Sequence, residues 1–181
     1  QTNQVIKSLH VGDYPVTMCY SPTSNKVYVR TDQDMRLDVI DGSGDTLLGS
    51  VATGAYMHAR PDAWHQATNR LFVADLNTDS IHVIDCASDT VVCSVHVGPQ
   101  PQGTCAAAPN GLVYQCCTNG IWVVSAAGDS VVATIPGETS TDVCCYAPFP
   151  SKLYAAGNGY ICVIDCDSNR VTKRLPGGVS F

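Results

Sequence analysis

Residues 69–98 read NRLFVADLNTDSIHVIDCASDTVVCSVHVG, and the prediction of the fold starts from these residues. It contains three runs rich in Val, Ile and Phe, separated by short polar segments with Asp, Asn and Ser. A similar stretch, NKVYVRTDQDMRLDVIDGSGDTLLGSVATG, occupies residues 25–54, so equivalent positions lie 44 residues apart. Two further copies, at residues 111–137 and 151–177, begin 40 residues apart. Such self-similarity is typical of proteins that stack one supersecondary unit several times.

Each repeat contains four short apolar runs, which we interpret as β-strands. The first run precedes a Pro-containing turn, as in VTMCYSP at 16–22 and VCCYAP at 143–148. Short runs rich in Val, Ile and Tyr, bounded by turn residues, predict strands, and no stretch has a long helical period. Four short strands in each repeat predict an all-β fold, a β-propeller of four-stranded antiparallel blades. The predicted blades lie in a single domain over 1–181, at about 16–54, 60–98, 104–137 and 143–177.

Asparagine–glycine pairs mark two of the predicted hairpins. Asn119-Gly120 and Asn158-Gly159 lie between the second and third runs of the last two repeats. Because Asn and Gly accept positive φ angles, these pairs predict two-residue type I′ turns.

The N-terminal residues add one strand too many. NQVIKSLHVG at 3–12 resembles the last run of each repeat, so the sequence predicts an extra outer strand without the three that precede it. It would belong to a longer array, complete a blade in another chain, or replace the C-terminal strand in ring closure. An unpaired strand is a template for association. We therefore favour a fragment or subunit of a larger assembly over an isolated four-bladed ring.

The repeat resembles the YVTN-type β-propeller repeats of surface-layer-like extracellular proteins. The resemblance rests on V-x-V-I-D followed by (D/N)-x-V and, later, on S-P-x-x-N-K-x-Y-V, and it covers nearly the whole chain. The YVTN step itself reads YVRT at 28–31, FVAD at 72–75, YQCC at 114–117 and YAAG at 154–157. This resemblance implies a propeller and an extracellular or cell-surface location, and it leaves the function open.

Composition excludes some partners and raises a question about cysteine. The 181 residues are 45% apolar and 14% charged, with a net charge of −6 and no basic stripe for nucleic acid. No segment approaches the ~18 apolar residues of a membrane span.

Ten cysteines suggest either disulfides in an oxidising compartment or small buried side chains. Cys86 and Cys93 flank one turn and are the candidate disulfide.

The candidate binding residues lie in loops that we expect at one end of the blades. They are polar or aromatic side chains in outer-to-inner connections or at the start of an inner strand: Tyr14, Tyr56, His58, Gln102 and Asp142. Propellers bind through such loops. No nucleophile elbow, phosphate loop or cluster of metal ligands is visible, so we predict no catalytic residue, metal or cofactor.

These observations favour a non-enzymatic extracellular scaffold with a structural or binding role, such as a surface-layer or filament subunit. Its expected partners are further blades or copies of itself, through strand addition by residues 3–12, and not nucleic acid or membrane. The alternatives are a propeller-type enzyme or redox domain, lactonase-like or quinoprotein-like, and an intracellular protein-interaction scaffold.

The aromatic position of the innermost run gives the first testable prediction. Tyr20, Trp64 and Tyr146 share this position, where a ring would pack between neighbouring blades. Substitution of Trp64 by Ala should lower the free energy of unfolding by about 3–5 kcal/mol. Denaturant unfolding measures this loss, and a change in melting temperature of only a degree or two would contradict the placement.

Overall fold

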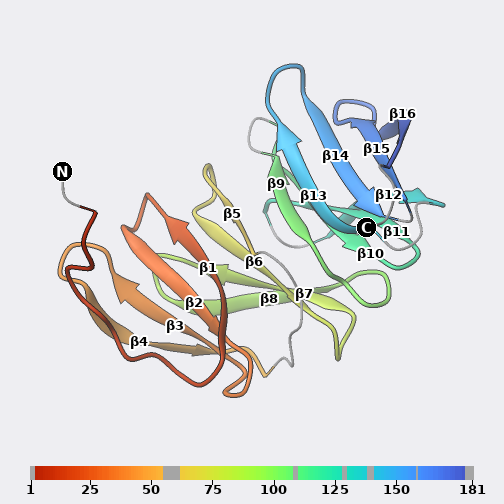
Figure 1. The fold of residues 1–181 in the computed structure, drawn as a ribbon. Helices are drawn as coiled ribbons and strands as arrows, with labels where there is room; N and C mark the ends of the chain where they lie inside the picture. The colour runs from red at the N-terminus through yellow and green to blue at the C-terminus, as the bar shows by residue number, and fades with distance from the viewer. Residues whose placement is uncertain are drawn as a thin grey trace.

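The computed structural model is an open arc of four β-sheets (Figure 1). It describes residues 3–54, 62–107, 110–127, 130–137, 141–157 and 159–177, without the side chains of 105–107 and 141–142. The described residues form sixteen strands and no helix. Each sheet has four antiparallel strands in sequence order, which confirms the predicted all-β blades.

The strands of the first two blades are separated by short turns. In the first blade these are β1 (Pro15–Ser21), β2 (Lys26–Thr31), β3 (Arg36–Asp41) and β4 (Thr46–Ala52). In the second blade these are β5 (Ala63–His65), β6 (Arg70–Asp75), β7 (Ser80–Asp85) and β8 (Thr90–His96).

The last two blades repeat this order. The third contains β9 (Thr104–Ala107), β10 (Leu112–Cys117), β11 (Gly120–Ser125) and β12 (Val131–Pro136). The fourth contains β13 (Thr141–Ala147), β14 (Lys152–Gly157), β15 (Tyr160–Asp165) and β16 (Arg170–Pro176). The inner strands β1, β5, β9 and β13 contact one another in turn, so the blades fan out from a common inner edge.

The apolar core lies between the blades rather than within any one of them. Tyr28 and Leu37 of the first blade pack against Leu71 and Ile84 of the second. The second and third blades enclose another cluster, and the third and fourth enclose the last. Because side chains alternate across a strand, each sheet contributes one face to each neighbour. Trp64 packs in the first cluster, as the sequence predicted for this position.

The same β-bulge recurs in every blade. The pairing between the third and fourth strands shifts at Val39/Ile40, Val83/Ile84, Val123/Val124 and Val163/Ile164. An extra residue at this point turns the rest of the outer strand over, so that its later side chains face the next blade.

The predicted turn at Asn119-Gly120 is displaced by one residue. Gly120 is the first residue of β11 and pairs with Cys117, so the hairpin loop consists of residues 118 and 119. Gly120 has a φ of 141°, and a Cβ atom there would lie 2.5 Å from the Ile135 carbonyl oxygen. The glycine is therefore required by close backbone approach. In the last blade Gly159 has a φ of 79°, while Asn158 lies outside the described residues.

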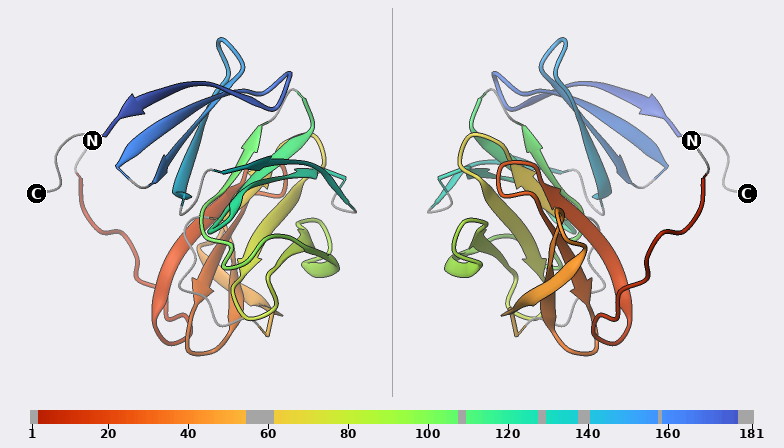
Figure 2. Two further views of the ribbon diagram at one scale, coloured as in Figure 1. Left: turned by 90° about the vertical axis from the view of Figure 1, so that its right-hand side faces the viewer. Right: turned by 90° about the vertical axis from the view of Figure 1, so that its left-hand side faces the viewer.

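The expected extra strand at residues 3–12 does not form. The segment has no regular secondary structure and runs beside the first blade (Figure 2). Lys7, Leu9 and Val11 line a groove of about 460 Å³ against that blade, together with Met18 and Val29 among others. The third strands β3, β7, β11 and β15 already pair with their own outer strands. Among the described residues, the segment therefore finds no third strand with a free edge.

The crowded turn at Gly120 gives a second prediction. Gly120→Ala should destabilise the fold by about 2 kcal/mol or more, because the new methyl group meets backbone atoms at a positive φ. Gly49→Ala is the matched control, since a Cβ there meets nothing within 4 Å. Thermal unfolding of the two variants compares them, and equal melting temperatures would contradict the placement of Gly120.

Candidate functional site

The predicted loop residues do not converge on one site among the described residues. Tyr14 precedes β1 and Gln102 precedes β9, so they belong to different blades with β5 between their strands. The Tyr14 carbonyl accepts a hydrogen bond from the Asp32 amide at 3.1 Å, and the Gln102 amide donates to the Cys116 carbonyl at 2.8 Å. Both residues therefore fasten a connection to a hairpin. Tyr56 and His58 lie outside the described residues, as does the side chain of Asp142.

A charged network covers the hairpin end of the first blade. Arg36 Nε donates to Asp38 at 2.8 Å, and its Nη2 lies 3.5 Å from Asp34. The hydrogen bond to Asp38 raises the pKa of Arg36 above its usual value. The amides of Gly12 and Asp13 donate to Asp38 and Asp34 at 2.6 and 2.8 Å. The network thus ties the N-terminal segment to the hairpin between β2 and β3.

A buried ion pair joins the first two blades near this network. Arg30 Nη2 lies 2.7 Å from Asp62 Oδ1, and the two side chains are 0% and 2% exposed. The same nitrogen donates to the Ala74 carbonyl at 3.2 Å. Burial raises the pKa of Asp62, while the Arg30 guanidinium opposes that shift. The sequence signal was Arg30, a charged residue two positions after Tyr28 and therefore on the same face of β2, and sequence reasoning overlooked it.

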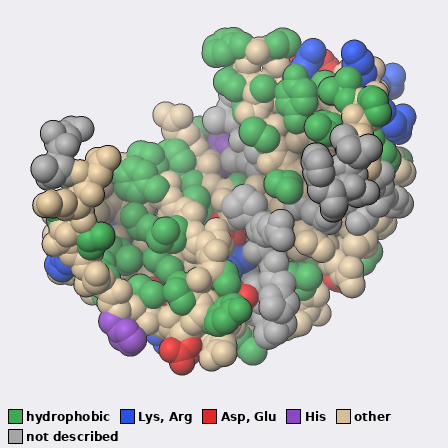
Figure 3. Space-filling model, viewed as in Figure 1, with side chains coloured by type: hydrophobic (Ala, Val, Ile, Leu, Met, Phe, Trp, Pro, Cys, Tyr) green, Lys and Arg blue, Asp and Glu red, His purple; other side chains and the backbone are tan. Residues whose placement is uncertain are grey.

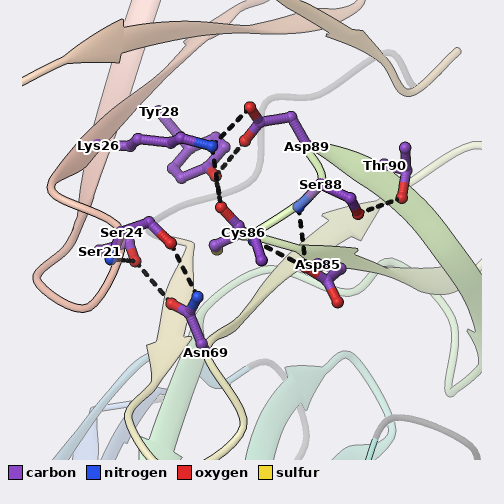
Figure 4. Close-up of polar contacts among 11 residues, drawn as sticks. Ser21, Ser24, Lys26, Tyr28, Asn69, Asp85, Cys86, Ser88, Asp89 and Thr90 are labelled. Atoms are coloured by element: carbon purple, nitrogen blue, oxygen red, sulfur yellow. Dashed lines mark hydrogen bonds and ion pairs between the residues drawn. The ribbon is translucent and has the colours of Figure 1, made fainter.

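A tyrosine joins the first two blades at the opposite end (Figure 4). The Tyr28 hydroxyl donates to Asp89 Oδ1 at 2.6 Å and to the Cys86 carbonyl at 3.3 Å. Lys26 Nζ lies 2.7 Å from Asp89 Oδ2 and donates to the same carbonyl at 3.1 Å. Burial raises the pKa of Tyr28, and the hydrogen bond to Asp89 adds to this rise. We call this arrangement the tyrosine contact.

The tyrosine contact recurs between the third and fourth blades. The Tyr114 hydroxyl donates to Asn169 Oδ1 at 2.9 Å and to the Cys166 carbonyl at 3.3 Å. Tyr114 and Tyr28 occupy equivalent positions, as do Asn169 and Asp89. The second blade carries Phe72 at this position, which is fully buried and packs toward the third blade. The repeat therefore places one aromatic ring at each interface.

An asparagine reinforces the first of these interfaces. The Ser21 hydroxyl donates to Asn69 Oδ1 at 2.8 Å, and Asn69 Nδ2 donates to the Ser24 hydroxyl at 2.8 Å (Figure 4). Trp64 Nε1 donates to the same Oδ1 at 3.1 Å. Asn69 thereby connects a turn of the first blade to the inner strand of the second.

The predicted Cys86–Cys93 disulfide is wrong. Cys86 is a buried thiol that packs between the first and second blades, whereas Cys93 packs toward the third. The β-bulge at Val83/Ile84 pairs Cys93 with Val83 and so moves its side chain to the other face of the sheet. Burial raises the pKa of the Cys19 and Cys117 thiols to about 12, so both are protonated and unreactive at neutral pH.

In the described part of the chain, the two outer sheets each leave one face without a neighbouring blade. The first-blade end face carries Met18 and Tyr20, which are 69% and 49% exposed. The fourth-blade end face carries Val143, Cys145 and Tyr154, and Tyr154 is 38% exposed. Hydrophobic side chains lie over both end blades in the space-filling view (Figure 3).

The described part of the chain contains no group of three or more His, Cys, Asp or Glu side chains placed to hold a metal ion. No helix long and apolar enough to cross a bilayer occurs among these residues.

Comparison with known proteins gives structural neighbours only. No protein-family model matches the chain, and no curated protein sequence matches it. Hydrazine synthase of Kuenenia stuttgartiensis superposes with a TM-score of 0.79 at 20% identity, over 96% of this chain and 53% of that one. The Cps50 (Swd1) β-propeller domain of Myceliophteria thermophila gives 0.75 at 10% identity, over 98% and 59%. The WD40 repeats of RRP9 give 0.75 at 12%, over 93% and 52%.

The chain has a β-propeller fold. The radial blades and these superpositions together confirm the predicted fold class. The chain spans little more than half the length of the propeller chains it matches. At identities of 20% or less, the likeness concerns the fold alone.

The tyrosine contact gives the third prediction. Tyr28→Phe should lower the free energy of unfolding by about 1–2 kcal/mol, because the Asp89 carboxylate loses a short hydrogen bond at a partly buried interface. Tyr14→Phe is the matched control, since the Tyr14 ring is 64% exposed. Urea unfolding compares the two variants, and an equal effect of both would show that the contact contributes nothing to stability.

Proposed function

We propose that this chain is a non-enzymatic scaffold that carries part of a larger propeller assembly, and that its two end faces are its binding surfaces. The observation that carries the proposal is the exposure of interface positions on those faces. Tyr20 is equivalent to Trp64, which packs between two blades. Tyr154 is equivalent to Tyr28, which is 1% exposed in the tyrosine contact.

The composition of the end faces supports this role. A sheet in a propeller is apolar on both sides because each side packs on a neighbouring blade. Exposed apolar patches on otherwise soluble domains mark interaction surfaces. The end faces therefore fit further propeller blades better than they fit solvent.

The proposal also includes an extracellular or cell-surface location and a place in the YVTN-type repeat family. The resemblance of the V-x-V-I-D repeats to YVTN-type repeats supports an extracellular or cell-surface scaffold. The structural neighbours include an enzyme by name and two propeller or repeat domains, so they favour neither an enzymatic nor a scaffold function. A surface-layer subunit fits the repeat type, and the open end faces fit a subunit that binds further blades.

Dye binding tests the proposal on the dilute chain. A fluorescent dye specific for exposed apolar surface should bind the folded chain, and the double variant Met18→Glu/Val143→Glu should lose most of the signal. Its melting temperature should stay near that of the unmodified chain, because neither side chain lies in an inter-blade cluster. The control is Val83→Glu, whose side chain is fully buried and whose substitution should unfold the chain.

A dye signal that is absent, or that survives the double variant, would show that the end faces are not the binding surfaces. Elemental analysis and an absorption spectrum of the purified chain test the non-enzymatic part. A stoichiometric metal or a bound chromophore would contradict it.

A further inference from the structure

We infer that the fourth-blade end face of one chain binds the first-blade end face of a second copy, through a tyrosine contact like that between the first and second blades. The inference rests on the proposed function, because it names the partner that the end faces bind. Both halves of the contact are present in this chain, one at each end of the arc.

The donor half lies on β14. Lys152 and Tyr154 are equivalent to Lys26 and Tyr28 of β2. Lys152 lies opposite Asp165 in the strand register, as Lys26 lies opposite Asp41, so the two pairs have the same position within their blades. Tyr28 and Lys26 reach the next blade of the chain, whereas Tyr154 is 38% exposed.

The acceptor half lies in the turn between β3 and β4. Asp45 is equivalent to Asp89 and Asn169, and the three share a left-handed backbone with φ angles of 49°, 56° and 54°. Gly42 is equivalent to Cys86 and Cys166, whose carbonyls accept the tyrosine hydroxyl. Cys86 and Cys166 are buried beneath the preceding blade, while Gly42 and Asp45 are exposed. The turn therefore presents a carboxylate and a carbonyl in the geometry that accepts Lys and Tyr.

The charges of the two end blades are complementary. Residues 13–54 contain six Asp and three Lys or Arg, whereas residues 141–177 contain three Asp and four Lys or Arg. The basic side chains gather over the fourth blade (Figure 3). Opposite charge on two surfaces steers their encounter and disfavours the reversed pairing of like ends.

Apolar side chains surround this polar contact. Cys145 is equivalent to Cys19, which packs against the cluster between the first two blades. A second copy would cover Cys145 in the same way and would place Tyr20 where Trp64 lies. The serines that bind Asn69 are replaced by Ala147 and Pro150, so Lys152 and Tyr154 supply the polar part of this interface.

Two copies of the chain supply enough blades to close a propeller ring. The described residues form four blades, so two copies of them provide eight, and the chain covers 52–59% of the propeller chains that it resembles. Propellers contain about four to eight blades. Two head-to-tail contacts related by a two-fold axis close the ring and leave no end face exposed.

The N-terminal segment competes for this surface. Leu9 is equivalent to Leu175 of β16, so β16 of the second copy would occupy the place of residues 3–12 on the first blade. The segment is largely exposed and pairs with no strand. Its release is therefore part of the inferred association, and Leu9→Asp, which weakens its packing in the groove, should tighten the dimer.

Analytical ultracentrifugation tests the inference on the full chain, from micromolar to millimolar concentration. We expect a reversible species of twice the 19.2 kDa chain mass. Asp45→Lys and Lys152→Asp should each raise the dissociation constant about tenfold or more, and the double variant should restore it. Asp167→Lys is the matched control, because Asp167 lies in the turn that faces the third blade, and it should leave the constant unchanged. Thermal unfolding shows that each variant is folded.

Labelling of Cys145 gives an independent readout. Its reaction with a thiol reagent should be about tenfold slower in the dimer than in dilute chain, because the interface covers it. A chain that stays monomeric, a species heavier than two chains, charge variants without effect, or weaker association of Leu9→Asp would overturn the inference. A monomer that still binds dye at its end faces would leave the proposed function standing, whereas loss of dye binding removes both.

Discussion

The structure depends on sheets that are apolar on both sides. Among the residues that the structure describes, no blade encloses a core of its own, because its side chains alternate between the preceding and the following blade. Leu71 and Phe72 are adjacent on β6, yet they belong to different clusters. Burying both faces requires a neighbour on each side, so a row of blades is either closed into a ring or carries two apolar ends. The end faces, the exposed tyrosines and the proposed partners all follow from this constraint.

Much of the fold follows from the sequence because local pattern and global packing agree. The alternation of Val, Ile and Tyr specifies strands, and the repeat fixes their number and order. The sequence alone could not place residues 3–12. They have the pattern of an outer strand, but such a strand forms only when a third strand has a free edge with which it can pair. It also misplaced the turn at Asn119-Gly120, because the need for glycine at position 120 comes from the Ile135 backbone on the neighbouring strand.

The candidate site was less predictable, for two physical reasons. One is the β-bulge, which inverts the face of Cys93 relative to Cys86 without any clear signal in the sequence. The other is that Asp62 and Arg30 meet across an interface between residues far apart in the chain. Pairs of this kind are visible only once the blades are docked. The donor side of the tyrosine contact, by contrast, is visible in the repeat as Tyr28, Tyr114 and Tyr154. Only its acceptor had to be identified from the structure.

The four described blades form an open arc in which the inner blades are covered on both faces and the end blades on one. Hydrogen–deuterium exchange on the dilute chain tests it most directly, because amide protection reports local opening. We expect the amides of β6, β7, β10 and β11 to exchange most slowly and those of the first and fourth blades to exchange earlier. Protection of all four blades to the same extent in dilute monomer would contradict the open arc.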